Sequence, residues 1–347
     1  MRCVINRKRI HLRQKRLMRQ IRRRNAWETQ RNRSKRRVKH SNEKAKNYFR
    51  PAFSKVYTPI LFSFEHNREG VLHFINNTYR DYKGYRNGLL SFIMDDTVKM
   101  DLIAICLLLS LLNKLTFNNI KYIGTFPKNS SASNFMEESG FFDVMKSSRP
   151  KRKSRRFNNQ MYLIGQNQID TEQIGLSVQH AMAHIIGVEE NFDPAYEIIV
   201  EICSNSVEHG NENTEEKNWL VSISYEEDRV HFIVSDNGQG ILKTLHRKAK
   251  DLFRDVANVK SADDVLKGVF NKRYQSRTNE MNRHKGLPHV KECFENGEIS
   301  NLSCLTNKVL YNFTSGQSFI LKNEYQGCLF CWDVTKENYN KWIENEF

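Results

Sequence analysis

The sequence has no hydrophobic run long enough to span a membrane. Its longest apolar stretch, residues 102–112, is interrupted by Ser110 and is shorter than the roughly 20 residues that a membrane-spanning helix requires. The first residues also lack the apolar segment of a secretory signal peptide. We therefore expect a protein of the reducing cytoplasm without a membrane partner.

Cysteine is sparse, with seven residues scattered along the chain. Cys328 and Cys331 have CxxC spacing, but no second pair or histidine cluster completes a zinc site. Both lie in an apolar, strand-like run, so we expect them to pack in a core. His180 and His184 are four residues apart without a third ligand nearby, so a helix surface is the expected place for this pair.

Acidic residues are nearly absent from the first 50 positions, which hold 20 Lys or Arg against two acids, whereas the rest of the chain sums to −2. Such an arm, residues 1–50, fits nucleic acid, an anionic membrane or an acidic protein partner. Nucleic acid, RNA or DNA, is favoured because arginine outnumbers lysine and binds phosphate through two hydrogen bonds at once. The clustered candidates are Arg22, Arg23, Arg24, Arg36 and Arg37.

The middle of the chain, residues 51–148, alternates strand-like and helix-like segments, which predicts a small α/β sheet. We expect strands at 57–64, 71–74, 89–94 and 120–123, and helices at 101–115 and 133–139. Residues 88–145 resemble a STAS domain, the module of anti-sigma factor antagonists, in the strand–DDTVKMDLIAICLLLSLL–strand run and the closing ESGFFDVM. The resemblance implies a protein-interaction surface. It implies no phosphoswitch, because the helix start at Asp101 has no serine.

Two polar motifs stand out in the second half. A predicted helix at 191–210 carries Glu201, Asn205 and His209, which share one face because they are four residues apart. Downstream, a predicted buried strand at 230–235 leads into the turn Asp236–Gly240, written DNGQG. A polar stripe on a helix beside an aspartate-led glycine turn suits a nucleotide and its metal ion. A further amphipathic helix is expected at 169–186.

These motifs resemble the GHKL ATPase superfamily, which includes histidine kinases, gyrase, heat-shock chaperones and anti-sigma kinases. The resemblance covers about 164–334 and implies a cofactor pair of ATP and Mg²⁺. By that resemblance Asn205 binds the magnesium, Glu201 is the catalytic general base, and His209 supports the phosphate site. Asp236 receives the adenine amino group, and Gly238 and Gly240 shape the base pocket.

The later motifs of the superfamily match this sequence less well. Lys285, Gly286 and Leu287 resemble the glycine turn that opens the helix under the phosphates, although Pro288 occupies the place of a further glycine. The basic stretch 243–283 corresponds to the lid, with Arg273, Arg277 and Arg283 as further candidates. Gly327–Cys328 stands where the family often has Gly–Thr, and cysteine lacks the hydroxyl that contacts the base in the family.

We therefore expect an α/β protein with four parts. They are a basic arm at 1–50, a STAS-like α/β domain at 51–148, a basic linker at 149–160, and a two-layer α+β domain of the Bergerat type at 161–347. The expected function is a regulatory, Mg-ATP-binding and hydrolysing protein whose arm binds nucleic acid. Two alternatives stay open, namely an anti-sigma-type serine/threonine protein kinase and a non-hydrolysing, nucleic-acid-associated scaffold. A protein partner of the STAS-like domain and a homodimer are further candidate assemblies.

Overall fold

The computed structural model of the protein describes residues 53–82, 89–145, 160–166, 168–209, 218–248, 261–271 and 286–346. All of them belong to one of the chain's two units, Phe53–Phe347, and the predicted basic arm lies outside the described residues. Among the helices described, none combines the length and apolar character needed to cross a membrane.

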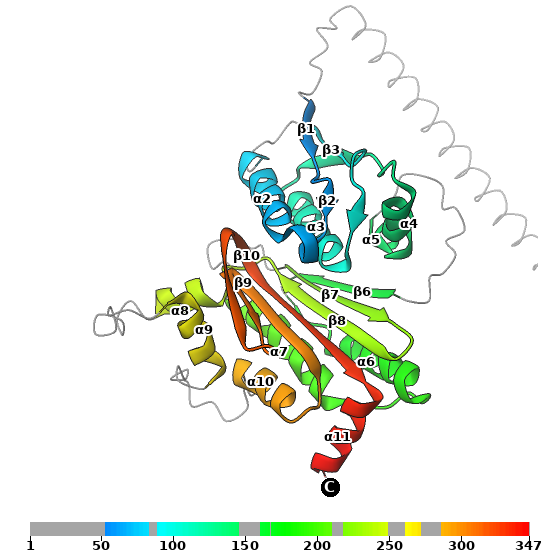
Figure 1. Ribbon diagram of the computed structural model, residues 1–347, viewed down its shortest axis with the longest axis vertical. Coiled ribbons are helices and arrows are strands. Elements are labelled where there is room, and N and C mark those ends of the chain that lie inside the picture. Colours follow the sequence, from blue (N-terminus) through cyan, green and yellow to red (C-terminus); the bar gives the residue numbers. More distant parts are fainter. Residues whose placement is uncertain are drawn as a thin grey trace, which may run out of the picture. The chain divides into compact units, whose positions relative to one another are not determined.

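The N-terminal part is a parallel sheet with helices (Figure 1). Its three strands have the order β1-β3-β5, and a second, two-stranded parallel ladder joins β2 to β4. The elements are β1 (Phe53–Tyr57), β2 (Leu61–Phe62), α2 (Phe64–Tyr82), β3 (Leu89–Ile93), β4 (Lys99–Met100), α3 (Leu102–Phe117), β5 (Lys121–Gly124), α4 (Ser130–Glu138) and α5 (Phe141–Val144).

One predicted strand is wrong, because residues 71–74 lie inside helix α2. A short apolar run fits a strand or a buried helix equally well, and here Val71, Leu72 and Ile75 are the helix's buried face. The helix is kinked at Asn67, whose side-chain oxygen accepts the Gly70 N–H at 3.2 Å and starts the regular turns. The predicted strand at 57–64 is also interrupted, because β1 ends at Tyr57 and α2 begins at Phe64.

The C-terminal part is a five-stranded antiparallel sheet in the order β6-β7-β8-β10-β9, with helices against it (Figure 1). The strands are β6 (Gln160–Gln166), β7 (Asn218–Tyr225), β8 (Arg229–Asp236), β9 (Ser300–Asn312) and β10 (Gln317–Thr335). The helices are α6 (Thr171–Ile186), α7 (Asp193–His209), α8 (Ile241–Lys248), α9 (Ala262–Phe270), α10 (Leu287–Glu295) and α11 (Lys336–Glu346).

The five-stranded sheet is buried on both faces, and its strands alternate between two cores. Val230, Phe232 and Val234 of β8 pack in a core with α6 and α7, whereas Ile233 packs in a second core with α3. Helix α3 is buried nearly all round, which is typical of a helix between two layers. Consistent with this placement, Ser110 Oγ of α3 shares a 3.0 Å hydrogen bond with Ser235 Oγ of β8.

The same alternation separates the two cysteines of the CxxC spacing. Cys328 belongs to the first core and Cys331 to the second, so they lie on opposite faces of β10. Both are free and buried. His180 and His184 pack edge-on against the Tyr225 ring, with ring centroids 5.7 and 5.4 Å away. The pair therefore packs on a core aromatic residue, as a structural role requires.

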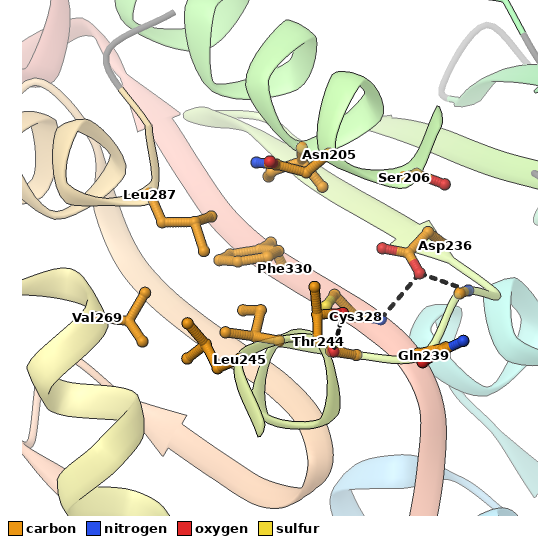
Figure 2. Close-up of a pocket in the computed structure, with 14 residues that line it drawn as sticks. Asn205, Ser206, Asp236, Gln239, Thr244, Leu245, Val269, Leu287, Cys328 and Phe330 are labelled. Atoms are coloured by element: carbon orange, nitrogen blue, oxygen red, sulfur yellow. Dashed lines mark hydrogen bonds between the residues drawn. The ribbon is translucent and has the colours of Figure 1, made fainter. Parts of the chain in front are cut away.

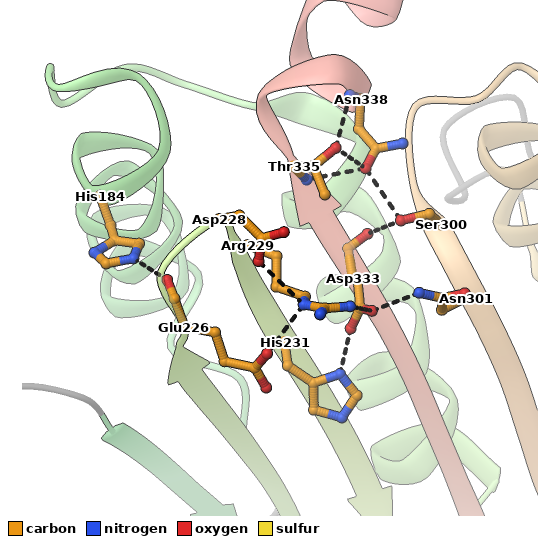
Figure 3. A network of polar contacts seen from close by, with 10 residues as sticks. All are labelled: His184, Glu226, Asp228, Arg229, His231, Ser300, Asn301, Asp333, Thr335 and Asn338. Carbon is orange, nitrogen blue, oxygen red and sulfur yellow. Dashed lines mark hydrogen bonds and ion pairs between the residues drawn. The ribbon is translucent and has the colours of Figure 1, made fainter.

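A polar network joins the strands at the end of β8 that lies opposite Asp236 (Figure 3). The Asp333 carboxylate contacts His231, accepts the Asn301 side-chain N–H at 2.7 Å, and lies 3.5 Å from the Arg229 guanidinium. Burial alone would raise the pKa of Asp333, but His231 and Asn301 outweigh it and lower that pKa below its usual value. The ionised Asp333 carboxylate in this network therefore stabilises the folded protein.

Candidate functional site

A pocket opens where β8 ends and the glycine turn begins (Figure 2). Its cavity volume is about 130 Å³. Most of its wall is apolar, and α7, the turn, α8, α9, α10 and β10 all contribute to it. The residues that contribute apolar side chains are Ile202, Ile241, Leu245, Val269, Leu287 and Phe330.

Asp236 is the buried acid of this pocket, with 6 % of its surface exposed. One carboxylate oxygen, Oδ1, accepts the N–H groups of Gly238 at 2.7 Å and Cys328 at 3.3 Å. The second oxygen points toward the interior of the pocket (Figure 2). Burial raises the pKa of Asp236 to about 6, against the lowering effect of those two hydrogen bonds. A ligand that donates a hydrogen bond to the second oxygen would favour the ionised form.

The groups around this acid do not titrate near neutral pH. Burial raises the pKa values of the Cys203, Cys304 and Cys328 thiols and of the Tyr325 phenol, so all four stay protonated. Tyr325 instead donates its hydroxyl hydrogen to the Asp236 backbone oxygen at 2.8 Å. Among these five described groups, Asp236 is therefore the one whose charge changes near neutral pH.

Two glycines allow the turn to lie close to its support. Gly240 has φ +81°, and a Cβ there would lie 2.6 Å from Asn307 Oδ1. Gly327 has φ +132°, and a Cβ there would lie only 2.1 Å from the Asp236 backbone oxygen. Both conformations are rare for residues with a side chain, so the backbone around Asp236 depends on glycine at both positions.

Gly327→Ala is therefore expected to destabilise the protein and to displace Asp236. The new methyl group would meet a backbone atom that cannot move aside without disturbing the β8–β10 pairing. We expect a loss of about 3 kcal/mol in unfolding free energy, measured by chemical denaturation. Gly316→Ala is the matched control, because that glycine also has positive φ but meets nothing within 4 Å. Equal losses in both variants would contradict the proposed close approach.

Helix α7 brings the Asn205 amide to the wall of the pocket and the Glu201 carboxylate beside it. Asn205 lines the pocket, and its Nδ2 donates a 2.8 Å hydrogen bond to Glu201 Oε1 one turn earlier. That bond uses the amide nitrogen and leaves the Asn205 amide oxygen as a ligand for a hard cation, which prefers oxygen. Magnesium typically takes few protein ligands and shares the rest with substrate phosphates, so this donor set fits Mg²⁺.

Helix α10 begins beside the pocket. Gly286 precedes it with φ +81° and caps it without a side-chain hydrogen bond, and Leu287 reaches the pocket. The N–H groups of a helix start favour phosphate oxygens. His289 in the first turn contacts Glu197 of α7, with Nε2 and Oε2 2.5 Å apart. This contact joins α10 to the helix that carries Asn205.

The structure brings most of the predicted site residues together. Asn205, Asp236, Gly238, Gly240 and Leu287 line one pocket, with Glu201 and Gly286 directly beside it. His209 is the last residue of α7, and its side chain lies outside the described residues, as do Lys285, Arg273, Arg277 and Arg283.

Sequence reasoning missed the wall that follows the glycine turn. Ile241, Thr244 and Leu245 of α8 line the pocket, and their i, i+3, i+4 spacing marks one helix face. Ser206, Gln239 and Phe330 line it as well. The spacing in α8 could have been found, but Phe330 could not, because any buried strand residue shows the same signal.

Residues 190–322 match the sequence model of the family described as histidine kinase-, DNA gyrase B-, and HSP90-like ATPase. A search of curated proteins finds no match for the chain. The matched segment begins just before α7, ends inside β10 and contains Glu201, Asn205 and Asp236. The chain therefore carries a GHKL-type ATP-binding domain, and its antiparallel sheet with helices is consistent with the Bergerat fold. Members of this family typically bind Mg-ATP.

Proposed function

We propose that the protein binds Mg-ATP in this pocket, hydrolyses it, and uses the ATP state to regulate a nucleic-acid-associated process. The buried Asp236 carries the proposal. One of its oxygens is held by two backbone N–H groups, and the other faces an apolar pocket. Such an acceptor matches the exocyclic amino group of adenine, and the apolar wall suits the flat faces of a base.

The phosphates of ATP would bind at the side of the pocket formed by α7 and α10. Asn205 would hold the magnesium ion through its amide oxygen, and the α10 N-terminus would receive phosphate oxygens. The bound ion would supply charge neutralisation on the phosphates. Glu201 lies within hydrogen-bond distance of Asn205, where it would take the proton from an attacking water. Titration calorimetry with ATP and release of inorganic phosphate test the two halves of this proposal.

Phosphoryl transfer to a protein hydroxyl is the alternative use of the same site, because one carboxylate can deprotonate water or a hydroxyl. The STAS-like identity of the N-terminal α/β part stays a prediction, and we propose that this part contacts a protein partner. Labelled ATP separates the two chemistries. Phosphoprotein without free phosphate would support a kinase, and free phosphate alone would support a hydrolase.

We propose that the arm at 1–50 is the segment that binds nucleic acid. A charge of +18 on 50 residues is the electrostatic pattern of a phosphate-binding segment. Deleting residues 1–50 is expected to abolish binding to RNA and DNA. The full chain should lose affinity steeply with salt, because every phosphate contact releases counterions. Fluorescence anisotropy with labelled oligonucleotides between low and high salt measures both.

A substitution series gives the matched control for the arm. Replacing Arg22, Arg23, Arg24, Arg36 and Arg37 with lysine keeps the charge but removes bidentate phosphate contacts, whereas glutamine removes both. We expect the glutamine series to lose most of the affinity and the lysine series to lose part of it. A flat salt response of the full chain would contradict nucleic-acid binding and point to a protein partner.

A further inference from the structure

The glycine turn is held from beneath by two consecutive residues of β9, Thr306 and Asn307. Thr306 Oγ1 accepts the Ile241 N–H at 2.9 Å. Asn307 Oδ1 accepts the N–H groups of Leu242 at 3.1 Å and Lys243 at 3.4 Å. The first N–H groups of any helix have no partner within that helix, so these two side chains cap α8 from a neighbouring strand.

Asn307 also holds the turn on its other side. Its Nδ2 donates to the Gln239 backbone oxygen at 2.8 Å and to Glu324 Oε1 at 3.0 Å. The residue is 5 % exposed and adopts φ +53°, a conformation that asparagine tolerates better than most residues. Asn307 thus bonds Gln239 of the glycine turn and the first residues of α8.

The next contact is a distorted segment of β10. Residues 321–324 lie opposite Lys308 alone, because the register passes from Ile320↔Val309 to Tyr325↔Asn307. A bulge of this kind leaves backbone N–H groups without strand partners. Glu324 at its end contacts Asn307 and also Lys243 of α8, where the Oε1–Nζ distance is 2.5 Å. The bulge therefore touches α8 directly and through Asn307.

Side chains of helix α2, in the N-terminal part, form hydrogen bonds with the backbone groups of the bulge. The Glu69 carboxylate accepts the N–H groups of Lys322 at 2.7 Å and Asn323 at 3.0 Å, and the Asn323 side-chain N–H at 2.9 Å. Asn76, two turns later, donates its Nδ2 hydrogen to the Glu324 backbone oxygen at 2.5 Å. These bonds replace the strand pairing that the bulge lacks, so α2 fixes the position of residues 322–324.

We propose that Asn307 is a positioning residue for the nucleotide pocket, and that Glu69 and Asn76 of α2 act on the pocket through Glu324 and Asn307. Hydrogen bonds from α2 fix the β10 backbone at residues 322–324, and the Glu324 side chain then bonds Asn307, which bonds Gln239 of the turn and the start of α8. Loss of these α2 hydrogen bonds would therefore release the turn and lower nucleotide affinity. Because such coupling is reciprocal, nucleotide bound at the turn would in turn stabilise the contacts of α2 with residues 322–324. The affinity claim rests on the proposed function, whereas the hold on the turn does not.

The test compares Glu69→Gln with Asp81→Asn. Both remove one negative charge from α2, but Asp81 is exposed and pairs with Arg80 on the same helix. Hydrogen exchange of the amides of residues 239–243 is followed in the nucleotide-free protein, and ATP and GTP affinities are measured in parallel. We expect Glu69→Gln to speed exchange and weaken ATP binding by about five- to tenfold, with a smaller preference for ATP over GTP. Asp81→Asn should change none of these.

A double-mutant cycle with Asn307→Asp closes the test. Aspartate keeps the acceptor for Leu242 and Lys243 but places a carboxylate oxygen against the Gln239 oxygen and Glu324. If α2 acts through Asn307, the effects of the two variants on exchange should be less than additive. Unchanged exchange in Glu69→Gln, or full additivity, would overturn the proposal. Altered exchange in a protein that binds no ATP would support the positioning role and refute the proposed nucleotide site instead.

Discussion

Asp236→Asn should abolish ATP binding and at the same time raise the stability of the nucleotide-free protein at pH 7.5. The asparagine oxygen can still accept the N–H groups of Gly238 and Cys328. Its amide nitrogen would then face the pocket in place of the second carboxylate oxygen. A donor would meet the adenine amino group, so we expect at least about a hundredfold loss of affinity.

The gain in stability follows from the raised pKa. Asp236 has a pKa of about 6 in the folded protein against 3.8 for an ordinary aspartate, so the folded state binds more protons between these values. Stability therefore falls as pH rises from about 4 to 6, and above pH 6 the full cost is present. Removing the charge should recover about 1–2 kcal/mol at pH 7.5, less at pH 5, and nothing near pH 3.8.

Asp333→Asn is the matched control, because the pKa of Asp333 is shifted in the opposite direction to that of Asp236. The pKa of Asp333 is lowered by His231 and Asn301 against the effect of burial, so its ionised form stabilises the fold above the ordinary pKa. That variant should lose stability at pH 7.5 and keep ATP affinity. Denaturant titrations at pH 5.0 and 7.5 measure both variants. A loss of stability in Asp236→Asn, or retained ATP affinity, would contradict the assigned role.

Glu201→Gln should retain ATP affinity and lose turnover. Glutamine preserves an oxygen for the Asn205 hydrogen bond but cannot take a proton from water. Removing a general base typically costs on the order of 10²–10⁴ in rate. Asn205→Ala should behave differently, losing the magnesium dependence of nucleotide binding because its amide oxygen is the proposed ligand. Phosphate release and titration with and without magnesium distinguish the two.

The control for these variants is Glu172→Gln, which removes a charge from exposed surface on α6. It should keep wild-type turnover and affinity. Unchanged hydrolysis in Glu201→Gln would contradict the general-base role but would leave the nucleotide site intact. Labelled protein without released phosphate in the wild type would instead favour the kinase chemistry.

The sequence was most informative where spacing alone determines geometry. The spacing of Glu201 and Asn205 predicts a shared helix face, and the structure places them 2.8 Å apart. The strand before Asp236 was equally clear, because a short apolar run that ends in an aspartate and glycines is typical of a buried strand entering a turn. The strand predicted at residues 71–74 was wrong for the converse reason. Four residues are too few to show whether apolar side chains recur with the period of a helix or of a strand.

The support beneath the pocket could not be predicted. Asn307 and Glu69 are far apart in the sequence and belong to no motif, and their roles depend on a bulge in β10 that has no local signal. The packing of α3 against the five-stranded sheet was not predicted either. An apolar helix buried nearly all round needs neighbours on more than one side, and residues of the five-stranded sheet cover it.

Titration calorimetry of the wild-type protein with ATP, with and without magnesium, tests the central claim most directly. We expect saturable one-to-one binding with a dissociation constant below about 1 mM. The affinity should rise with magnesium and be higher for ATP than for GTP. Binding should release protons near pH 6 as Asp236 ionises. Absence of saturable binding in the millimolar range, with the protein folded, would contradict the proposed nucleotide site.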